Sequence, residues 1–243
     1  MLRQTSFSLL ILVVLLGAVL SGSALAQQSD FPVPPGRIVA GDDTGLFTML
    51  TDGTAKTYLA QEEEADCWLR DGVWSPDGSQ IMYTSICGGE GPGDWLPDPE
   101  RTDLRERTAQ VMIVDPLNGT TRALVPSDGI HQDYAGDWHP NGDQVVIYSN
   151  RDASGVFNLF MYDLAGGALT QLTTFDSNVS RVSFDPTGSY LLYNRRIVET
   201  DDIRYEVRAL DLATLTEIPV AKGFTPAWSR DGRWIAFATE GEV

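Results

Sequence analysis

The sequence predicts an all-β protein, a β-propeller of four-stranded antiparallel blades. Three observations predict it: a tight-turn motif at near-constant spacing, a second marker that follows three of the turns, and strand-like apolar runs between them. The turns are WSPDG at 74, WHPNG at 138, FDPTG at 184 and WSRDG at 228, separated by 64, 46 and 44 residues. The second marker contains Asp115, Asp163 and Asp211, which are 48 residues apart. Because a blade buries its faces only against neighbouring blades, the repeats must stack. The alternative is an ordinary β-sandwich.

The residue types within one repeat predict the order of its strands. The aromatic residue ends an innermost strand and packs between sheets, proline and Asp or Asn form the turn, and glycine takes the positive φ angle. In the strand after the first turn, Ile81, Tyr83 and Ser85 should face one side and Met82 and Thr84 the other. The later runs QVVIYS at 144 and YLLYN at 190 are more uniformly apolar, as strands covered on both faces should be.

The number of strands sets the number of blades. RIVAG from 37, LFTML from 46 and KTYLA from 56 are interpreted as the last three strands of a blade. Three complete repeats follow, and the repeat that begins near 228 contains two strands. We therefore expect four to five blades. The ring either closes, with one end of the chain completing the blade begun by the other, or is incomplete.

The first residues predict export. Residues 1–26 have an early cation at Arg3, an apolar stretch from about Phe7 to Leu20 and a small-residue end at Ala24-Leu25-Ala26, which is typical of a secretory signal peptide. A retained membrane anchor is the alternative, although the stretch is short for a membrane span. Residues 27–36 are then a short linker and residues 37–243 the propeller domain. The predicted location is periplasmic or extracellular.

The net charge limits the classes of partner. The formal charge is −17, with 34 acidic and 17 basic residues among 243. Nucleic acids and anionic membrane surfaces attract cations, so neither is expected as a partner. The simplest role of such a charge is solubility.

Two cysteines flank the first turn. Because the hairpin turns between Pro76 and Gly78, Cys67 and Cys87 should lie opposite each other on the first two strands of that blade. In an exported protein such a pair favours a disulfide. It would hold the base of an insertion, residues 88–108, which is rich in glycine, proline and charge and is expected to be a loop.

Half of the acidic residues fall in loops that should emerge on one face of the propeller. These are the blade-to-blade and second-to-third-strand loops, and together they hold 17 acidic and seven basic residues. The loops are 61–66, 88–108, 126–133, 150–156, 174–179, 195–202 and 221–223. Such a face would attract cationic peptides, basic protein surfaces or Ca²⁺. The predicted binding residues are Glu62, Glu63, Glu64 and Asp66, with Trp95 of the insertion as an apolar anchor.

Residues just before each turn should line the central channel, where a small ligand or a partner's peptide would meet them. They are Asp71, Tyr134, Asp137, Arg181, Ser183 and Thr225. The sequence contains no G-x-S-x-G, phosphate-binding glycine loop, H-E-x-x-H or EF-hand spacing. His131 and His139 should lie on opposite faces and share no metal. No catalytic residue, metal site or cofactor is predicted, apart from the Ca²⁺ alternative.

The repeats resemble those of TolB-type propellers, a WD-repeat-like family of secreted and periplasmic proteins. The resemblance covers roughly residues 37–240 and rests on WSPDGSQIMYTS, WHPNGDQVVIYSNRDASGVFNLFMYDLAGGALTQLT and AWSRDGRWIAFAT. It includes the propeller part of TolB only, without the additional α/β domain that precedes it there. Function is poorly specified by such a fold.

Two classes of function follow from these observations. The first is an exported, non-enzymatic propeller that binds a protein or peptide, expected to be cationic, at the acidic loop face. The alternative is the gating propeller of a prolyl-oligopeptidase-like serine peptidase whose catalytic domain is absent from this chain. A self-contained propeller hydrolase or lyase is a third interpretation.

Overall fold

The computed structural model is all-β and describes residues 11–15, 36–61, 67–88, 108–127, 129–199 and 202–239, with only the backbone described at 11–15 and at a few strand ends. No helix occurs in these ranges. The strands are β1 (Ile11–Leu15), β2 (Arg37–Asp42), β3 (Gly45–Leu50), β4 (Thr57–Ala60), β5 (Cys67–Trp74), β6 (Ile81–Cys87), β7 (Thr108–Val114), β8 (Thr121–Ala123), β9 (Asp133–Trp138), β10 (Gln144–Ser149), β11 (Asn158–Asp163), β12 (Leu169–Gln171), β13 (Val179–Phe184), β14 (Tyr190–Glu199), β15 (Asp202–Asp211), β16 (Thr216–Lys222), β17 (Phe224–Trp228) and β18 (Trp234–Ala238).

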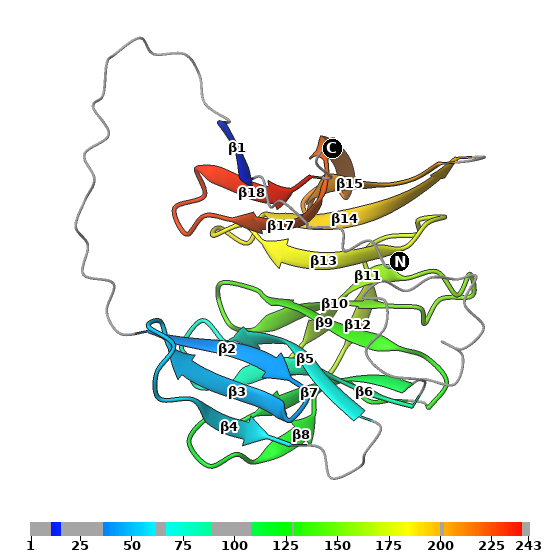
Figure 1. The fold of residues 1–243 in the computed structure, drawn as a ribbon. Helices are drawn as coiled ribbons and strands as arrows, with labels where there is room; N and C mark the ends of the chain where they lie inside the picture. The colour runs from blue at the N-terminus through cyan, green and yellow to red at the C-terminus, as the bar shows by residue number, and fades with distance from the viewer. Residues whose placement is uncertain are drawn as a thin grey trace, which may run out of the picture.

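Five antiparallel sheets form an incomplete propeller ring. Three have four strands, β5–β8, β9–β12 and β13–β16, and they are flanked by the sheets β2-β3-β4 and β1-β18-β17. The innermost strands β2, β5, β9, β13 and β17 follow one another around the arc, each packing against the next (Figure 1). The predicted repeats and their strand count are confirmed, and the two terminal sheets do not close the ring.

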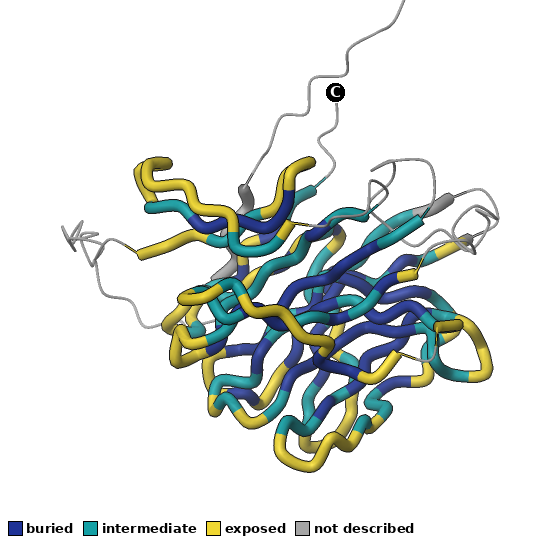
Figure 2. The backbone as a smooth tube through the Cα atoms, turned by 90° about the horizontal axis from the view of Figure 1, so that it is seen from below, coloured by how far each residue is buried: buried dark blue, intermediate teal, exposed yellow. Residues whose placement is uncertain are grey.

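The core consists of apolar layers between neighbouring sheets. Figure 2 shows that the buried residues lie along the strands and the exposed ones mostly in the turns. Ile81 and Tyr83 pack toward β2–β4, whereas Met82, the residue between them, packs toward β9–β12. The alternation predicted for this strand is therefore confirmed, and it follows from the two-residue period of a β-strand. Burial is deepest in the middle strands: Val145, Val146 and Ile147 of β10 are fully buried.

In each of the four sheets from β5 onward, the innermost strand has a β-bulge. The bulge lies two to three residues before the aromatic residue of the motif turn. Asp71, Arg181 and Thr225 occupy the bulges of β5, β13 and β17 with φ angles of 57°, 54° and 56°. Positive φ costs a non-glycine residue about 1 kcal/mol, so the surrounding sheets must hold these residues there. At Gly136, an added Cβ would lie 2.4 Å from Val182 Cγ1 of β13 and 2.5 Å from Val146 O of β10, so neither neighbour leaves room for a side chain.

The bulge in β5 also sets the register of the cysteines. Beside the turn, Trp74 pairs with Ile81, and beyond the bulge Cys67 pairs with Cys87. The bulge adds a residue to β5, and this one-residue shift brings the two cysteines opposite each other. The structure confirms the predicted disulfide between them.

The strand β1 lies within the predicted signal peptide. It pairs antiparallel with β18, with Ile11 opposite Ala238 and Leu15 opposite Trp234. A search of the described residues for a helix long and apolar enough to cross a membrane finds none.

Candidate functional site

The loops at the second-to-third-strand end of the sheets are held by side chains that bond over long sequence distances. Asn158, the first residue of β11, is fully buried. Its Oδ1 accepts hydrogen bonds from Phe175 N at 2.7 Å and Thr173 Oγ1 at 2.8 Å, and its Nδ2 donates to Asp152 Oδ2 at 2.9 Å. Gln171 Nε2 also donates to Asp152 Oδ2, at 3.0 Å. The loops 150–156 and 174–179 are therefore tied to each other through Asn158 and Asp152.

Three ion pairs, made by two arginines, also hold this part of the structure in place. Arg151 Nη2 lies 2.5 Å from Asp133 Oδ2, and the side chain of Asp133 is only 1% exposed. Arg195 of β14 lies 2.6 Å from Glu217 Oε2 through Nη1 and 2.9 Å from Asp176 Oδ1 through Nη2. Its Nε donates to Ser177 Oγ at 3.1 Å. Arg195 thus has a carboxylate on either side and little freedom to move.

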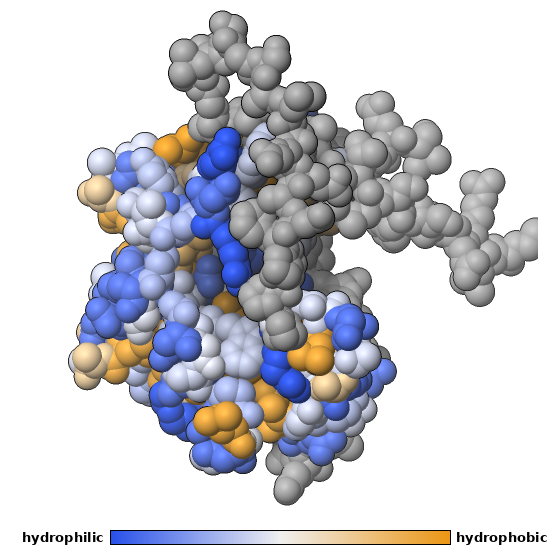
Figure 3. All heavy atoms as spheres, turned by 90° about the vertical axis from the view of Figure 1, so that its left-hand side faces the viewer, coloured by the Kyte–Doolittle hydropathy of each residue, from blue (hydrophilic) through white to orange (hydrophobic). Residues whose placement is uncertain are grey.

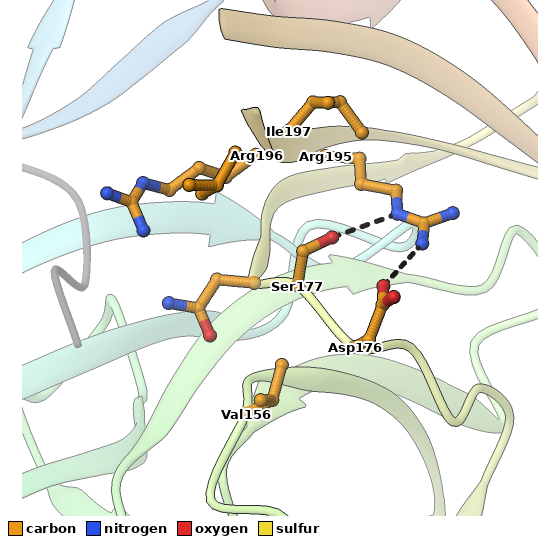
Figure 4. Close-up of a pocket in the computed structure, with 8 residues that line it drawn as sticks. Val156, Asp176, Ser177, Arg195, Arg196 and Ile197 are labelled. Atoms are coloured by element: carbon orange, nitrogen blue, oxygen red, sulfur yellow. Dashed lines mark hydrogen bonds and ion pairs between the residues drawn. The ribbon is translucent and has the colours of Figure 1, made fainter. Parts of the chain in front are cut away.

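A pocket of about 400 Å³ opens among these loops, and we call it the loop-face pocket. Its lining residues come from three segments of the face predicted from the sequence: Val156, Asp176, Ser177, Asn178, Arg195, Arg196, Ile197 and Val198. Figure 4 shows Arg195 reaching Ser177 and Asp176, while the side chain of Arg196 points away from them. Neighbouring residues of a strand face opposite sides, so only one of the two arginines joins this network.

Exposure determines which of the lining groups a partner can reach. The side chain of Asp176 is 90% exposed, whereas that of Arg195 is 17% exposed. Val198 is exposed, Val156 and Ile197 are half-buried, and Arg196 is buried. The most accessible groups of the loop-face pocket are therefore the Asp176 carboxylate, which is paired with Arg195, and the side chain of Val198. A cationic group next to an apolar one complements them.

The channel residues predicted from the sequence are brought together in part. Asp71 Oδ1 and Arg181 Nη1 form an ion pair between β5 and β13, which lie on either side of β9. Burial would lower the pKa of Arg181, but the charge of Asp71, the nearby Tyr148 and the hydrogen bond to Asp71 together outweigh burial, and the pKa is raised. Tyr148 is buried nearby, where burial and then the charge of Asp71 raise its pKa. Tyr134 stacks on Tyr148 with ring centroids 5.1 Å apart.

The other predicted channel residues have structural roles. Asp137 accepts hydrogen bonds from Trp138 N and from Phe184 N of the next sheet, both at 2.8 Å. Its carboxylate lies between the two sheets, and this burial raises its pKa to about 6. Thr225 N donates to Asn194 Oδ1 at 2.9 Å, and Ser183 Oγ is buried without a hydrogen-bond partner among the described residues. In this channel the polar groups largely bind one another, so it is a weaker candidate for a ligand site than the loop-face pocket.

Most of the predicted acidic face lies outside the described residues. Glu62, Glu63, Glu64, Asp66 and Trp95 all do, together with most of the insertion. The acids of this face whose side chains are described are Asp133, Asp152 and Asp176, and each bonds to residues of the same face. In the described part, Asp133 and Asp176 pair with arginines, and Asp152 bonds to uncharged side chains.

His139 is bonded within its own turn. His139 lies in the turn after β9, with Nδ1 2.6 Å from Asn141 Oδ1 and its ring edge-on to Phe184. No group of three or more His, Cys, Asp or Glu side chains able to hold a metal ion occurs in the described ranges.

Several site residues were not singled out from the sequence. Arg195, Asp176 and Ser177 belong to the predicted loops, but nothing in their spacing marks a pocket. Asn158 and Asp152 had a signal, because they lie in SNRDASGVFN, the most complete hairpin of the repeats. A polar residue that begins a buried strand needs a partner, and this rule would have identified Asn158.

Comparisons with known proteins support the fold. No protein-family model matches the chain, and no curated protein matches it in sequence. Among solved structures, a protein assigned as TolB from Agrobacterium tumefaciens superimposes with a TM-score of 0.64 at 16% identity, covering 84% of this chain and 70% of that one. The tricorn protease gives a TM-score of 0.59 at 13% identity over 82% of this chain and 23% of its own.

An oligogalacturonate lyase from Vibrio parahaemolyticus gives a TM-score of 0.57 at 12% identity, covering 81% of this chain and 53% of the lyase. At such identities the likeness is one of fold. These relatives have different activities, so the fold alone does not select one of them for this chain.

Proposed function

We propose that this chain is the propeller of an exported protein that binds a peptide or protein partner at its loop face. The observation that carries the proposal is the loop-face pocket, where the exposed Asp176 carboxylate lies beside exposed Val198. The pocket is built on strand ends that Asn158 and Arg195 hold in place, and a rigid frame lowers the cost of binding.

The chemistry of the pocket favours a basic residue next to an aliphatic one. An ammonium or guanidinium group would pair with Asp176, and the neighbouring aliphatic side chain would pack against Val198 and Val156. Glu62, Glu63, Glu64 and Asp66, which belong to the same predicted face, would add attraction for a cationic partner. The disulfide between Cys67 and Cys87 supports an exported protein, because such bonds persist in oxidising compartments.

A positional-scanning library of short peptides tests this function. We expect the labelled chain to select Lys or Arg followed by Val, Ile or Leu. Asp176→Asn should weaken binding of the selected peptide about threefold to tenfold, because one exposed charge pair is lost. Combined Glu62, Glu63 and Glu64→Gln should weaken it further.

The matched control is Asp143→Asn. Asp143 is an exposed carboxylate in the turn between β9 and β10, and turns of this type lie at the opposite end of the strands from the loop-face pocket. Asp143→Asn removes the same charge as Asp176→Asn, but far from the loop-face pocket, so it should leave peptide binding unchanged. Equal loss in both variants would mean that net charge alone attracts the peptide, and no loss in Asp176→Asn would place the site elsewhere.

A further inference from the structure

The sheet formed by β17 and β18 contains fewer strands than the three complete blades. Those blades have four strands each, whereas β17 and β18 are joined by a third strand only through β1. Without β1, the outward backbone groups of β18 would have no strand partner among the described residues, and such an edge invites pairing with another strand. The edge of β18 is therefore a place where an added strand is favourable.

Ile11–Leu15 shows how such a strand lies. It pairs antiparallel with β18 over five residues, with no shift of register between Ile11↔Ala238 and Leu15↔Trp234. The segment is Ile-Leu-Val-Val-Leu, uncharged and rich in residues that favour strands. The sequence also predicts that this segment is the apolar part of a signal peptide, and a segment that is removed or held in a membrane cannot occupy β18.

We propose that the edge of β18 is an acceptor site for an extended, apolar, uncharged peptide, which binds as an added antiparallel strand. Ile11–Leu15 occupies the site in the structure, and an apolar segment of a partner protein takes the same place when Ile11–Leu15 leaves it. Because β18 contributes nothing to the loop-face pocket, binding at the two sites is separable by mutation.

The backbone geometry shows which groups of β18 are offered to the added strand. Ser229 N donates to Trp234 O at 2.9 Å, so the polar backbone groups of Trp234 point toward β17. The direction of the backbone N–H and C=O groups alternates along a strand. The backbone groups of Ala236 therefore also point toward β17, and those of Ile235 and Phe237 point toward β1. In the added strand, the residues opposite Ile235 and Phe237 must supply the hydrogen bonds. These are the fourth and second residues of Ile11–Leu15.

The register also gives a position for a specific mutation. Ala236 is exposed, and it pairs with residue 13, the middle of the added strand. Because the backbone of Ala236 points toward β17, this pair is of the type without direct hydrogen bonds, in which side chains lie closest. A charge at 236 would therefore face the middle side chain of a bound peptide. Ala227 of β17 is also exposed and pairs with Ala236, but it lies one strand farther from the peptide.

The test uses the full chain with a protease site between Ala26 and Gln27, cut after folding. A fluorescent peptide with Ile-Leu-Val-Val-Leu between Ser-Asn flanks is titrated and its anisotropy measured. We expect saturable binding to the cut chain and weaker binding to the uncut chain, where the tethered segment competes. Ala236→Lys should weaken binding about fivefold, and Ala227→Lys should change it little.

Two peptide variants separate strand addition from nonspecific adhesion. Methylation of the second and fourth amide nitrogens should abolish binding, whereas methylation of the third and fifth, which face away from β18, should preserve it. A peptide with Glu in the middle position should bind Ala236→Lys better than the original chain. The proposal is overturned if there is no saturable binding, if both methylated peptides bind equally, or if the two lysine variants behave alike.

Discussion

The two ends of the blades are built by different kinds of contact. At the end with the motif turns, each turn satisfies itself: Ser75 Oγ donates to Asp77 Oδ1 at 2.6 Å, and Ser229 Oγ donates to Asp231 Oδ1 at 2.6 Å. At the loop face, by contrast, the bonds join residues far apart in the chain, such as Asp133 to Arg151 and Asp176 to Arg195. The turns repeat because their chemistry is local. The contacts at the loop face differ from blade to blade, and specific binding requires a surface that does not repeat.

On one side of the molecule, the apolar residues of the described surface are scattered. Figure 3 shows its apolar side chains in small groups separated by hydrophilic ones. The exposed large apolar residues are likewise scattered over several sheets, for example Ile38, Leu117 and Leu215. Scattered apolar residues are ordinary for a protein surface. This favours specific sites, such as the loop-face pocket, over a broad hydrophobic interface.

The largest effect on stability is expected at the loop face, from Asn158→Ala. The substitution leaves Phe175 N and Thr173 Oγ1 without their acceptor in a buried place, and each loss costs about 1 to 3 kcal/mol. We expect the free energy of unfolding to fall by about 4 kcal/mol in urea denaturation. A fall below about 1 kcal/mol would show that the network does not hold the loops.

Removal of the disulfide should have the next largest effect. Cys67 and Cys87 close a loop with a sequence separation of 20 residues. In the chain-entropy model such a crosslink is worth about 3 kcal/mol, through the unfolded state. Combined Cys67→Ser and Cys87→Ser should lower the urea midpoint accordingly. The same midpoint for the variant and the oxidised chain would contradict this expectation.

Asp137 is the exception at the turn end, since its carboxylate bonds across to the next sheet. Its folded pKa of about 6 lies above the usual value, so the protonated form stabilises the fold. That contribution is complete below about pH 4 and is lost as the pH rises through about 6, a difference of roughly 3 kcal/mol. Asp137→Asn removes this dependence.

The measurement for Asp137 is unfolding in urea at pH 4 and at pH 7. The variant should gain about 3 kcal/mol relative to the original chain between these two values. Carboxylates that the two chains share cancel in this difference. Parallel pH profiles for the two chains would show that Asp137 keeps an ordinary pKa in the fold.

The smallest effect is expected within a motif turn, from Asp77→Ala. Hydrogen bonds from Ser75 and Ser79 lower the pKa of Asp77 to about 2, and the residue is fully exposed, so water can replace them. We therefore expect only a small fall in the midpoint of thermal unfolding, much less than for Asn158→Ala. A loss as large as that for Asn158→Ala would remove the distinction between the two ends.

The sequence predicted what local chemistry determines. Proline, aspartate or asparagine, and glycine in the turns gave the number of strands and the blades, and the position of the first turn gave the cysteine pairing. The contact between Asp71 and Arg181 joins residues 110 apart, and no local pattern predicts it. The pairing of β1 with β18 was missed for another reason. An apolar run of Ile, Leu and Val suits a signal peptide and an edge strand equally.

The charge of the loop face could be predicted only in part. Counting residues gives an acidic face, yet the count does not show that Arg151 pairs with Asp133 and Arg195 with Asp176. Side-chain pairing depends on positions in space, which composition does not contain. The exposed carboxylate of Asp176 is the charge that remains accessible beside the loop-face pocket.

Reversing that charge tests the central proposal most directly. In Asp176→Arg the accessible group becomes cationic while the aliphatic residues beside it stay. Isothermal titration would compare the library-selected basic peptide with the same peptide carrying Glu in place of Lys or Arg, on the original chain and on the variant. We predict that the original chain prefers the basic peptide and the variant the acidic one. An unchanged preference in the variant would contradict binding at the loop-face pocket.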